Sequence, residues 1–183
     1  MRTFTSVAIS ATLLCCLFSA ARVAGQNIKN NFPDRRAIIA DVCPAISLSD
    51  FSFENKYGDR EQFFQSLSWK NTSEKPVAAF EVVVLKYDPF NRRMVGTRWT
   101  IDGKNSVDWS PLAPGEVSKD GTIEYGSDDV FTEIAYVRNL RFADGTLWTV
   151  NDAQLTARLR TLNTGITELG DVKPDSKPKN AKE

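Results

Sequence analysis

Apolar and polar residues alternate along the middle of the chain with a period of two, the spacing typical of β-strands. Residues 95–101 alternate throughout, and residues 63–70 alternate apart from Phe64, which falls on the polar side. Residues 77–87 are apolar on both faces, which predicts a strand buried in the centre of a sheet. The two faces are formed by Phe80, Val82 and Val84 and by Val83, Leu85 and Tyr87.

Turn signals separate the predicted strands. Residues 131–142 predict a long strand, and Asp144-Gly145 predicts a hairpin that returns through residues 147–150. Strand-sized runs with frequent turns and no helical period between them predict an all-β, immunoglobulin-like β-sandwich over residues 45–150. We expect the long strand to carry Ile134, Tyr136, Leu140 and Phe142 on a common face.

A short C-terminal helix is expected after the sandwich, over residues 151–163. Leu155, Leu159 and Leu162 recur there at helical spacing, and Asp152 is suited to be the N-cap residue. Residues 164–183 contain lysines and prolines but no aromatic residue, which predicts a flexible tail. Acidic residues dilute the positive charge of this tail, so it is not expected to tether the chain to a membrane.

The N-terminal sequence predicts export. Residues 1–25 combine Arg2, an apolar run of about a dozen residues and small residues near Gly25, which is the pattern of a signal peptide rather than of a membrane span. Residues 26–44 are polar and are expected to be irregular, with room for a short turn or strand at residues 37–39. We therefore expect a periplasmic or secreted protein without a membrane span in the mature chain.

Composition excludes several classes of function. The 183 residues include no histidine, and the 23 acidic residues balance the 23 basic ones. The chain can therefore form no Ser-His-Asp triad, and it lacks the basic surface that a nucleic-acid partner would require. It has no glycine-rich phosphate loop, zinc-binding Cys pair or dinucleotide fingerprint, so we expect no cofactor and no metal. The mature chain would keep only Cys43, either as a packing residue or as the link of a structural dimer.

Carboxylates are the remaining catalytic groups. The adjacent Asp128-Asp129 and the pair Asp102 and Asp108 leave open a carboxylate-based hydrolase, an enzyme subunit or a calcium-binding loop. Such acids are also common in solvated loops, which is the interpretation we favour. Lys86 lies among apolar strand residues, where it could be an amine with a perturbed pKa; we favour an edge position or one from which its ammonium group snorkels to solvent.

Five motifs occur in a recognisable order: WKNTS at 69–73, KPV at 75–77, LKYD at 85–88, APGE at 113–116 and FADGTLW at 142–148. In this order they resemble the exported bacterial immunoglobulin-like domains of the FxLYD type, most of which have no known function. The resemblance covers about residues 48–150. It implies a sandwich fold and a location outside the cytoplasm, and it implies no catalytic or binding residue.

Exposed aromatic residues are the better lead to function. Trp69 and Trp148 each lie on a strand beside a turn and are expected in the core. Trp99 and Trp109 flank a loop, and Trp109 is the candidate binding residue unless it folds back over the sandwich. We expect a non-catalytic binding or accessory module of the cell envelope or extracellular space, with a protein or glycan as its partner. Edge strands offer a second route to a partner, by strand addition.

Overall fold

The computed structural model describes residues 35–55, 62–103, 110–125, 129–162, 164–167, 169–170 and 172. The expected signal peptide and the part of the expected tail beyond residue 172 lie outside the described residues. Trp109, Asp108 and Asp128 also lie outside them.

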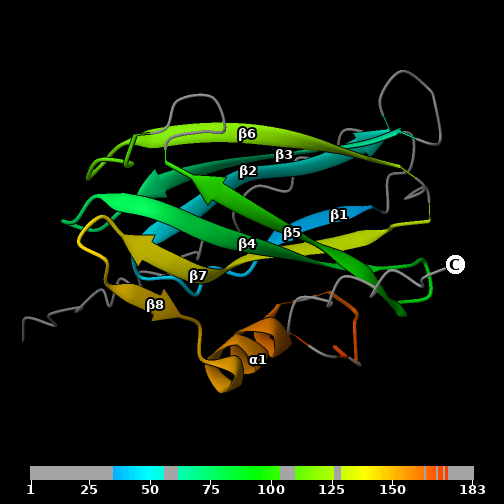
Figure 1. Cartoon of the computed structure of the whole chain (residues 1–183). Helices are drawn as coiled ribbons and strands as arrows, with labels where there is room; N and C mark the ends of the chain where they lie inside the picture. The colour runs from blue at the N-terminus through cyan, green and yellow to red at the C-terminus, as the bar shows by residue number, and fades with distance from the viewer. Residues whose placement is uncertain are drawn as a thin grey trace, which may run out of the picture.

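Two packed β-sheets form the body of the protein (Figure 1). Within the described residues, one sheet has five strands in the order β1-β7-β4-β5, with β8 also paired to β7, and the other has three strands in the order β2-β3-β6. The predicted all-β sandwich with a short C-terminal helix is confirmed. The strands are β1 (Arg36–Ile39), β2 (Ile46–Asn55), β3 (Gln62–Asn71), β4 (Val77–Tyr87), β5 (Arg93–Asp102), β6 (Val117–Tyr125), β7 (Thr132–Phe142) and β8 (Leu147–Thr149).

β4 lies in the centre of the five-stranded sheet, as its two apolar faces predict. It pairs with β5 on one side and with β7 on the other. The face that carries Phe80, Val82 and Val84 packs against the three-stranded sheet, where the rings of Phe80 and Trp69 meet edge to face at 5.5 Å. Trp69 is fully buried there, as predicted. Burying one large apolar side chain of this kind contributes about 2–3 kcal/mol, so this core is a main source of stability.

Cys43 belongs to the same inter-sheet core. Its side chain is 8% exposed and its thiol is free, which agrees with the packing interpretation. Burial raises the pKa of the thiol. An inter-chain disulfide would require this sulfur at the surface.

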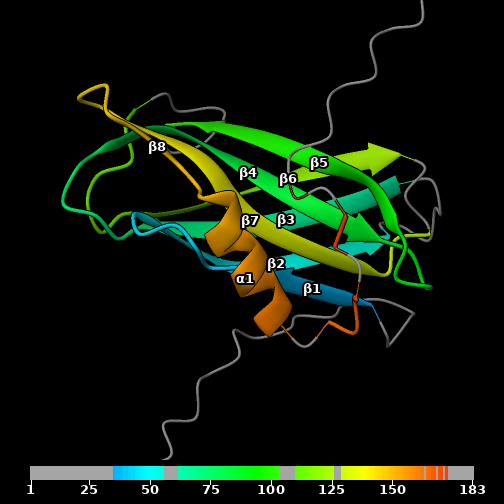
Figure 2. The ribbon, with the colours of Figure 1, turned by 90° about the horizontal axis from the view of Figure 1, so that it is seen from below.

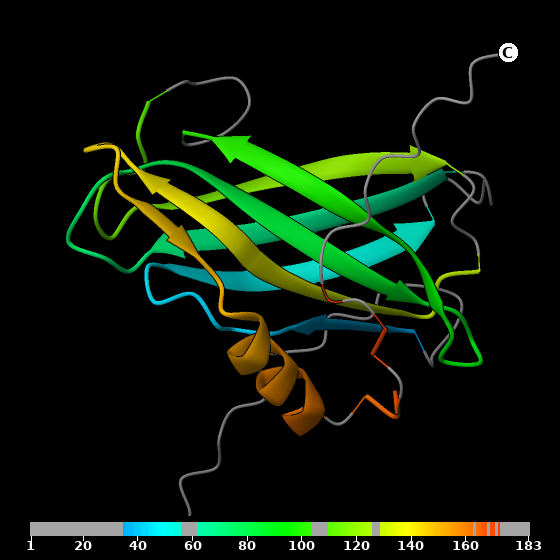
Figure 3. The same ribbon diagram turned by 60° about the horizontal axis from the view of Figure 1, so that its bottom comes forward.

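A helix covers part of the opposite face of the five-stranded sheet, so that the molecule has three layers (Figures 2 and 3). This helix, α1 (Asp152–Thr161), buries Leu155 and Leu159 against a second core cluster that includes Val83, Leu85 and Tyr136. No helix within the described ranges is long and apolar enough to cross a membrane.

The N-cap of α1 differs from the expected one. Asn151, one residue before Asp152, accepts hydrogen bonds through its Oδ1 from the backbone N–H groups of Ala153 at 2.9 Å and Gln154 at 3.1 Å. Asp152 lies in the first turn and pairs with the guanidinium of Arg138 on β7. The carboxylate of Asp152 is therefore used by Arg138, and Asn151 caps the helix.

The first part of the expected flexible tail is instead ordered against the sheet. The phenol of Tyr87 donates a hydrogen bond to the carbonyl of Leu169 at 2.9 Å, and the phenol of Tyr136 donates to the carbonyl of Val172. Leu169 and Val172 also pack against the second core cluster. Two largely buried phenols need acceptors, and this segment supplies them.

Two further features concern the five-stranded sheet. The short strand allowed at residues 37–39 is present as β1, which pairs in parallel with β7, so the sheet begins before residue 45. The long strand β7 does not keep one common face, because Val82 pairs with Val137 and Glu81 with Asn139, which leaves Arg138 as an extra residue. Beyond this bulge the pattern of faces reverses. Ile134 and Tyr136 consequently face α1, whereas Leu140 and Phe142 pack between the sheets.

Candidate functional site

The outer face of the five-stranded sheet is covered by α1 over only part of its length. Ala79 and Glu81 lie on the same face of β4 as Val83 and Leu85, because alternate strand residues share a face, but they lie beyond the helix-covered cluster. The strand register places two cross-strand rows there. We call these eight residues the outer patch: Asp102, Ala79, Arg141 and Leu147 in one row, and Thr100, Glu81, Asn139 and Thr149 in the other.

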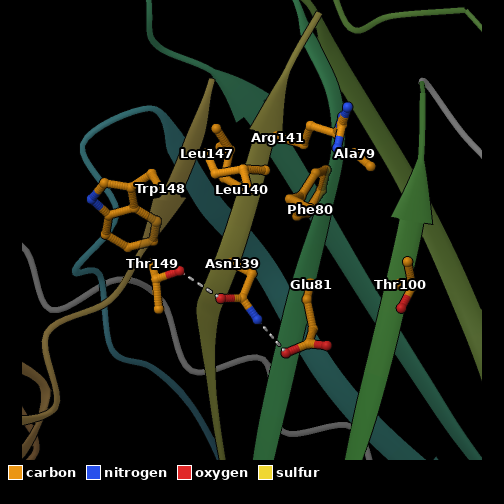
Figure 4. Close-up of a pocket in the computed structure, with 10 residues that line it drawn as sticks. All are labelled: Ala79, Phe80, Glu81, Thr100, Asn139, Leu140, Arg141, Leu147, Trp148 and Thr149. Carbon is orange, nitrogen blue, oxygen red and sulfur yellow. Dashed lines mark hydrogen bonds between the residues drawn. The ribbon is translucent and has the colours of Figure 1, made fainter. Parts of the chain in front are cut away.

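The outer patch contains a pocket of about 270 Å³ (Figure 4). Its lining comes from four strands, β4, β5, β7 and β8. Ala79 has the smallest side chain of its row and stands between the longer Asp102 and Arg141, so the row is hollowed at its centre. The residues that line the pocket are Ala79, Phe80, Glu81, Thr100, Asn139, Leu140, Arg141, Leu147, Trp148 and Thr149.

A chain of hydrogen bonds holds the polar side of this pocket in place (Figure 4). Thr149 Oγ1 donates to Asn139 Oδ1 at 2.9 Å, and Asn139 Nδ2 donates to Glu81 Oε1 at 3.0 Å. The other carboxylate oxygen of Glu81 lies 3.5 Å from Arg98 Nε. Both oxygens of Glu81 therefore face donor or positively charged groups, which fix the position of its carboxylate.

The β7–β8 hairpin forms one wall of the pocket. Its turn uses Gly145 at φ 88°, which fits the predicted Asp-Gly hairpin. The Asp144 carboxylate accepts hydrogen bonds from Lys75 Nζ at 2.7 Å and from the Thr146 N–H at 2.9 Å, and these donors hold the pKa of Asp144 below its usual range. Leu147 is 68% exposed at the rim. The hairpin thus holds a large apolar side chain in solvent.

Trp148 is half-buried rather than fully in the core. It pairs with Leu140 across β7 and β8. Its side chain packs against the inter-sheet core and against the second core cluster, and it also lines the pocket. The expectation of a core tryptophan is therefore met only in part. Trp148 and Leu140 thus connect the lining of the pocket with the close-packed core.

A second polar group lies inside the sandwich, between the sheets. Gln65 Nε2 on β3 donates to Glu133 Oε1 on β7 at 2.6 Å, and Lys86 Nζ on β4 lies 3.9 Å from the same oxygen. Lys86 also pairs with Glu124 on β6, which accepts a hydrogen bond from the hydroxyl of Thr97. We call Gln65, Lys86, Glu124 and Glu133 the buried polar cluster.

The position of Lys86 in the buried polar cluster differs from the expected one. This residue is 3% exposed on the central strand β4, and its ammonium group lies against the carboxyl groups of Glu124 and Glu133 rather than in solvent. Burial raises the pKa of Glu133 to about 8, although the Lys86 cation and the Gln65 donor act to lower it. Glu133 and Gln65 are both completely buried. A general acid must reach its substrate, so this arrangement is suited to stabilise and align the two sheets.

The residues predicted from the sequence do not come together at one site. Trp109, the candidate binding residue, lies outside the described residues, and so does one member of each aspartate pair. Asp102 lies at the end of β5 and Asp129 in a turn, and both are exposed. Trp99 lies half-buried on β5. In the part of the chain that the structure describes, no three acidic or cysteine residues converge as a metal site would require.

Sequence reasoning missed the outer patch. The one local signal was the polar Glu81 beside the small Ala78 and Ala79, in a strand whose other residues are mostly large and apolar. The patch itself depends on the register among strands that are far apart along the chain.

No family model matches the chain, and no curated protein matches it. Among solved structures, it is similar to a hypothetical protein of Peptoclostridium difficile 630, with a TM-score of 0.49 and 11% identity, over 63% of this chain and 92% of that one. It is also similar to a Bordetella pertussis protein with the provisional name ApaA, with a TM-score of 0.35 and 15% identity, over 57% and 84% of the two chains.

Proposed function

We propose that this protein is an exported, non-catalytic binding module of the cell envelope or extracellular space, and that the outer patch binds a protein partner. The observation that carries the proposal is the pocket above Ala79, with an exposed apolar side chain, Leu147, at its rim. Packed strands support its floor, and hydrogen bonds hold its polar wall. Rigid pockets that combine an apolar floor with a few fixed polar groups are typical of binding sites.

The size and chemistry of the pocket favour a protein over a glycan. A volume of about 270 Å³ accommodates roughly one large side chain of a partner. Leu147 adds apolar area beside it, and the backbone N–H and C=O groups of Leu147 lie on the outer edge of β8. The side chains of Glu81 and Asn139 are already bonded to one another, so fewer of their groups are left for sugar hydroxyls. An apolar anchor surrounded by polar groups is the usual centre of a protein interface.

The proposal includes export from the cytoplasm and membership of the FxLYD-type immunoglobulin-like domains. The signal-peptide pattern of residues 1–25 and the order of the FxLYD-type motifs support them. Fractionation of the host, with the N-terminal residue of the protein read by mass spectrometry, tests export. A chain found in the cytoplasm with its original N-terminus would contradict it.

Binding is tested by capturing partners with the chain, tagged at its carboxyl terminus and expressed in its own host. The outer patch is changed in two ways: Leu147→Asp removes the apolar rim, and Ala79→Leu fills the hollow. Val117→Asp is the matched control, because Val117 is also an exposed strand residue, 64% exposed, on the three-stranded sheet.

We expect the wild-type chain and the control to capture the same stoichiometric partner, and both patch variants to lose it. Circular dichroism and the urea midpoint verify that each variant is folded. Equal capture by all four proteins, or no protein captured above background, would show that the outer patch does not bind a protein partner.

A further inference from the structure

The strand β5 forms an edge of the five-stranded sheet. Along its unpaired side, alternate residues turn their backbone N–H and C=O groups outward. The Gly103 N–H donates to the Ala78 carbonyl at 2.8 Å, which sets the alternation between the two strands. By this alternation Trp99 and Ile101 turn their backbone groups toward β4, while Arg98, Thr100 and Asp102 turn theirs away. Within the described residues, no backbone group faces the outward N–H and C=O groups of these three residues.

The side chains of these three residues form a self-complementary series. If two copies of β5 pair antiparallel with Thr100 opposite Thr100, then Arg98 of each copy lies opposite Asp102 of the other. In this register each of the three pairs exchanges two backbone hydrogen bonds, because all three residues present both groups to the edge. Opposite charges directly across two strands are stabilising, and like charges are destabilising. A one-residue slip would lose both the charge pairing and the hydrogen bonds.

The inner face of β5 supports the same register. Trp99 and Ile101 point between the sheets, where Ile101 is 5% exposed and Trp99 is only half-buried. Pairing about Thr100 places Trp99 of each copy opposite Ile101 of the other. Aromatic and β-branched residues are a favourable cross-strand pair, and the indole would lose exposed apolar area.

We infer that two copies of this chain associate through β5 into a symmetric dimer with one continuous sheet across the interface. The two-fold axis is perpendicular to the sheet, so the same surface meets itself and both outer patches face the same side. The paired segment, residues 98–102, is short, so the dimer is expected to dissociate on dilution into the micromolar range. Its formation does not depend on whether the outer patch binds a partner.

Charge exchange tests the register. Arg98→Asp makes both edge positions acidic, and Asp102→Arg makes both basic, so each variant alone would place like charges opposite one another. Sedimentation velocity of the purified chain, over a range of concentrations, should show the dimer weakened by on the order of tenfold or more in each single variant. An equimolar mixture of the two variants should recover dimer, because every cross-strand pair is then of opposite charge.

Two further variants complete the experiment. Lys70→Asp, an exposed charge reversal on β3 of the other sheet, should leave dimerisation unchanged. Thr100→Pro removes an outward N–H that makes no hydrogen bond within the described chain, and it should weaken the dimer without charge change. A wild-type chain that stays monomeric at several hundred micromolar, or a mixture of the two charge variants that stays monomeric when the wild type dimerises, would overturn the inference.

Discussion

Glu133→Gln tests whether the buried polar cluster contains a neutral carboxyl group at position 133. Glu133 is completely buried, and its pKa of about 8 compares with an ordinary value of 4.5. Burial is the main cause, and Glu124 adds to it. The cations of Lys86 and Arg35 and the Gln65 donor act in the opposite direction. At neutral pH the carboxyl is therefore protonated in the folded chain and ionised in the unfolded chain.

The hydrogen bonds of the cluster agree with a protonated Glu133. Among the described residues, Glu133 Oε2 and Gln65 Oε1 are buried oxygens without a hydrogen-bond partner. If Glu133 Oε2 carries a proton, it becomes a hydrogen-bond donor. Gln65, the side chain to which Glu133 is already bonded, has an unused acceptor in its Oε1. A glutamine at position 133 offers the same donor and acceptor without a charge.

The effect on stability follows from proton linkage. Below pH 4.5 both states are protonated, and the full stability is present. Between pH 4.5 and pH 8 the unfolded chain has released the proton and the folded chain has kept it, so stability falls as the pH rises. At about 1.4 kcal/mol per pH unit, the loss approaches about 5 kcal/mol near pH 8 and then levels off. The glutamine variant has no proton to release and should not show this loss.

Urea denaturation of both proteins from pH 5 to pH 9 measures the difference. The chain has no histidine, so no imidazole titrates in this window. We expect the free energy of unfolding of Glu133→Gln, relative to the wild type, to rise by several kcal/mol between pH 5 and pH 8. Glu74→Gln, in an exposed turn, is the control and should track the wild type. A difference that stays constant with pH, or a wild type that gains stability over this range, would refute the reasoning.

Two further predictions concern the layer that covers the outer face. Asn151→Ala removes the side-chain acceptor for the N–H groups of Ala153 and Gln154 and should lower the free energy of unfolding by about 1 kcal/mol; an unchanged urea midpoint would argue against this cap. Tyr87→Phe removes the donor to the Leu169 carbonyl and should cost about 1 kcal/mol. Amide hydrogen exchange over residues 164–172 should then become faster than in the wild type, and unchanged protection would show that apolar packing alone holds this segment.

The main architecture could be predicted from local sequence patterns. A strand that is apolar on both faces can lie only where both faces are covered, so β4 had to be central. Asp144-Gly145 required a hairpin because glycine readily adopts a positive φ, and Leu155 and Leu159 required a helix with one buried side. These features depend on residues that are close together along the chain, which is why local pattern was enough to find them.

The partners of the polar residues and the position of the pocket depend on contacts between strands that are far apart along the chain. Lys86 was expected to place its ammonium group in solvent because its partners, Glu124 and Glu133, lie on strands that come later in the chain. The bulge at Arg138 reversed the faces of β7, and no local pattern announces such an extra residue. The outer patch arises from the register among β4, β5, β7 and β8. Register depends on the packing of whole sheets, so the site could be located only after the strands had been placed beside one another.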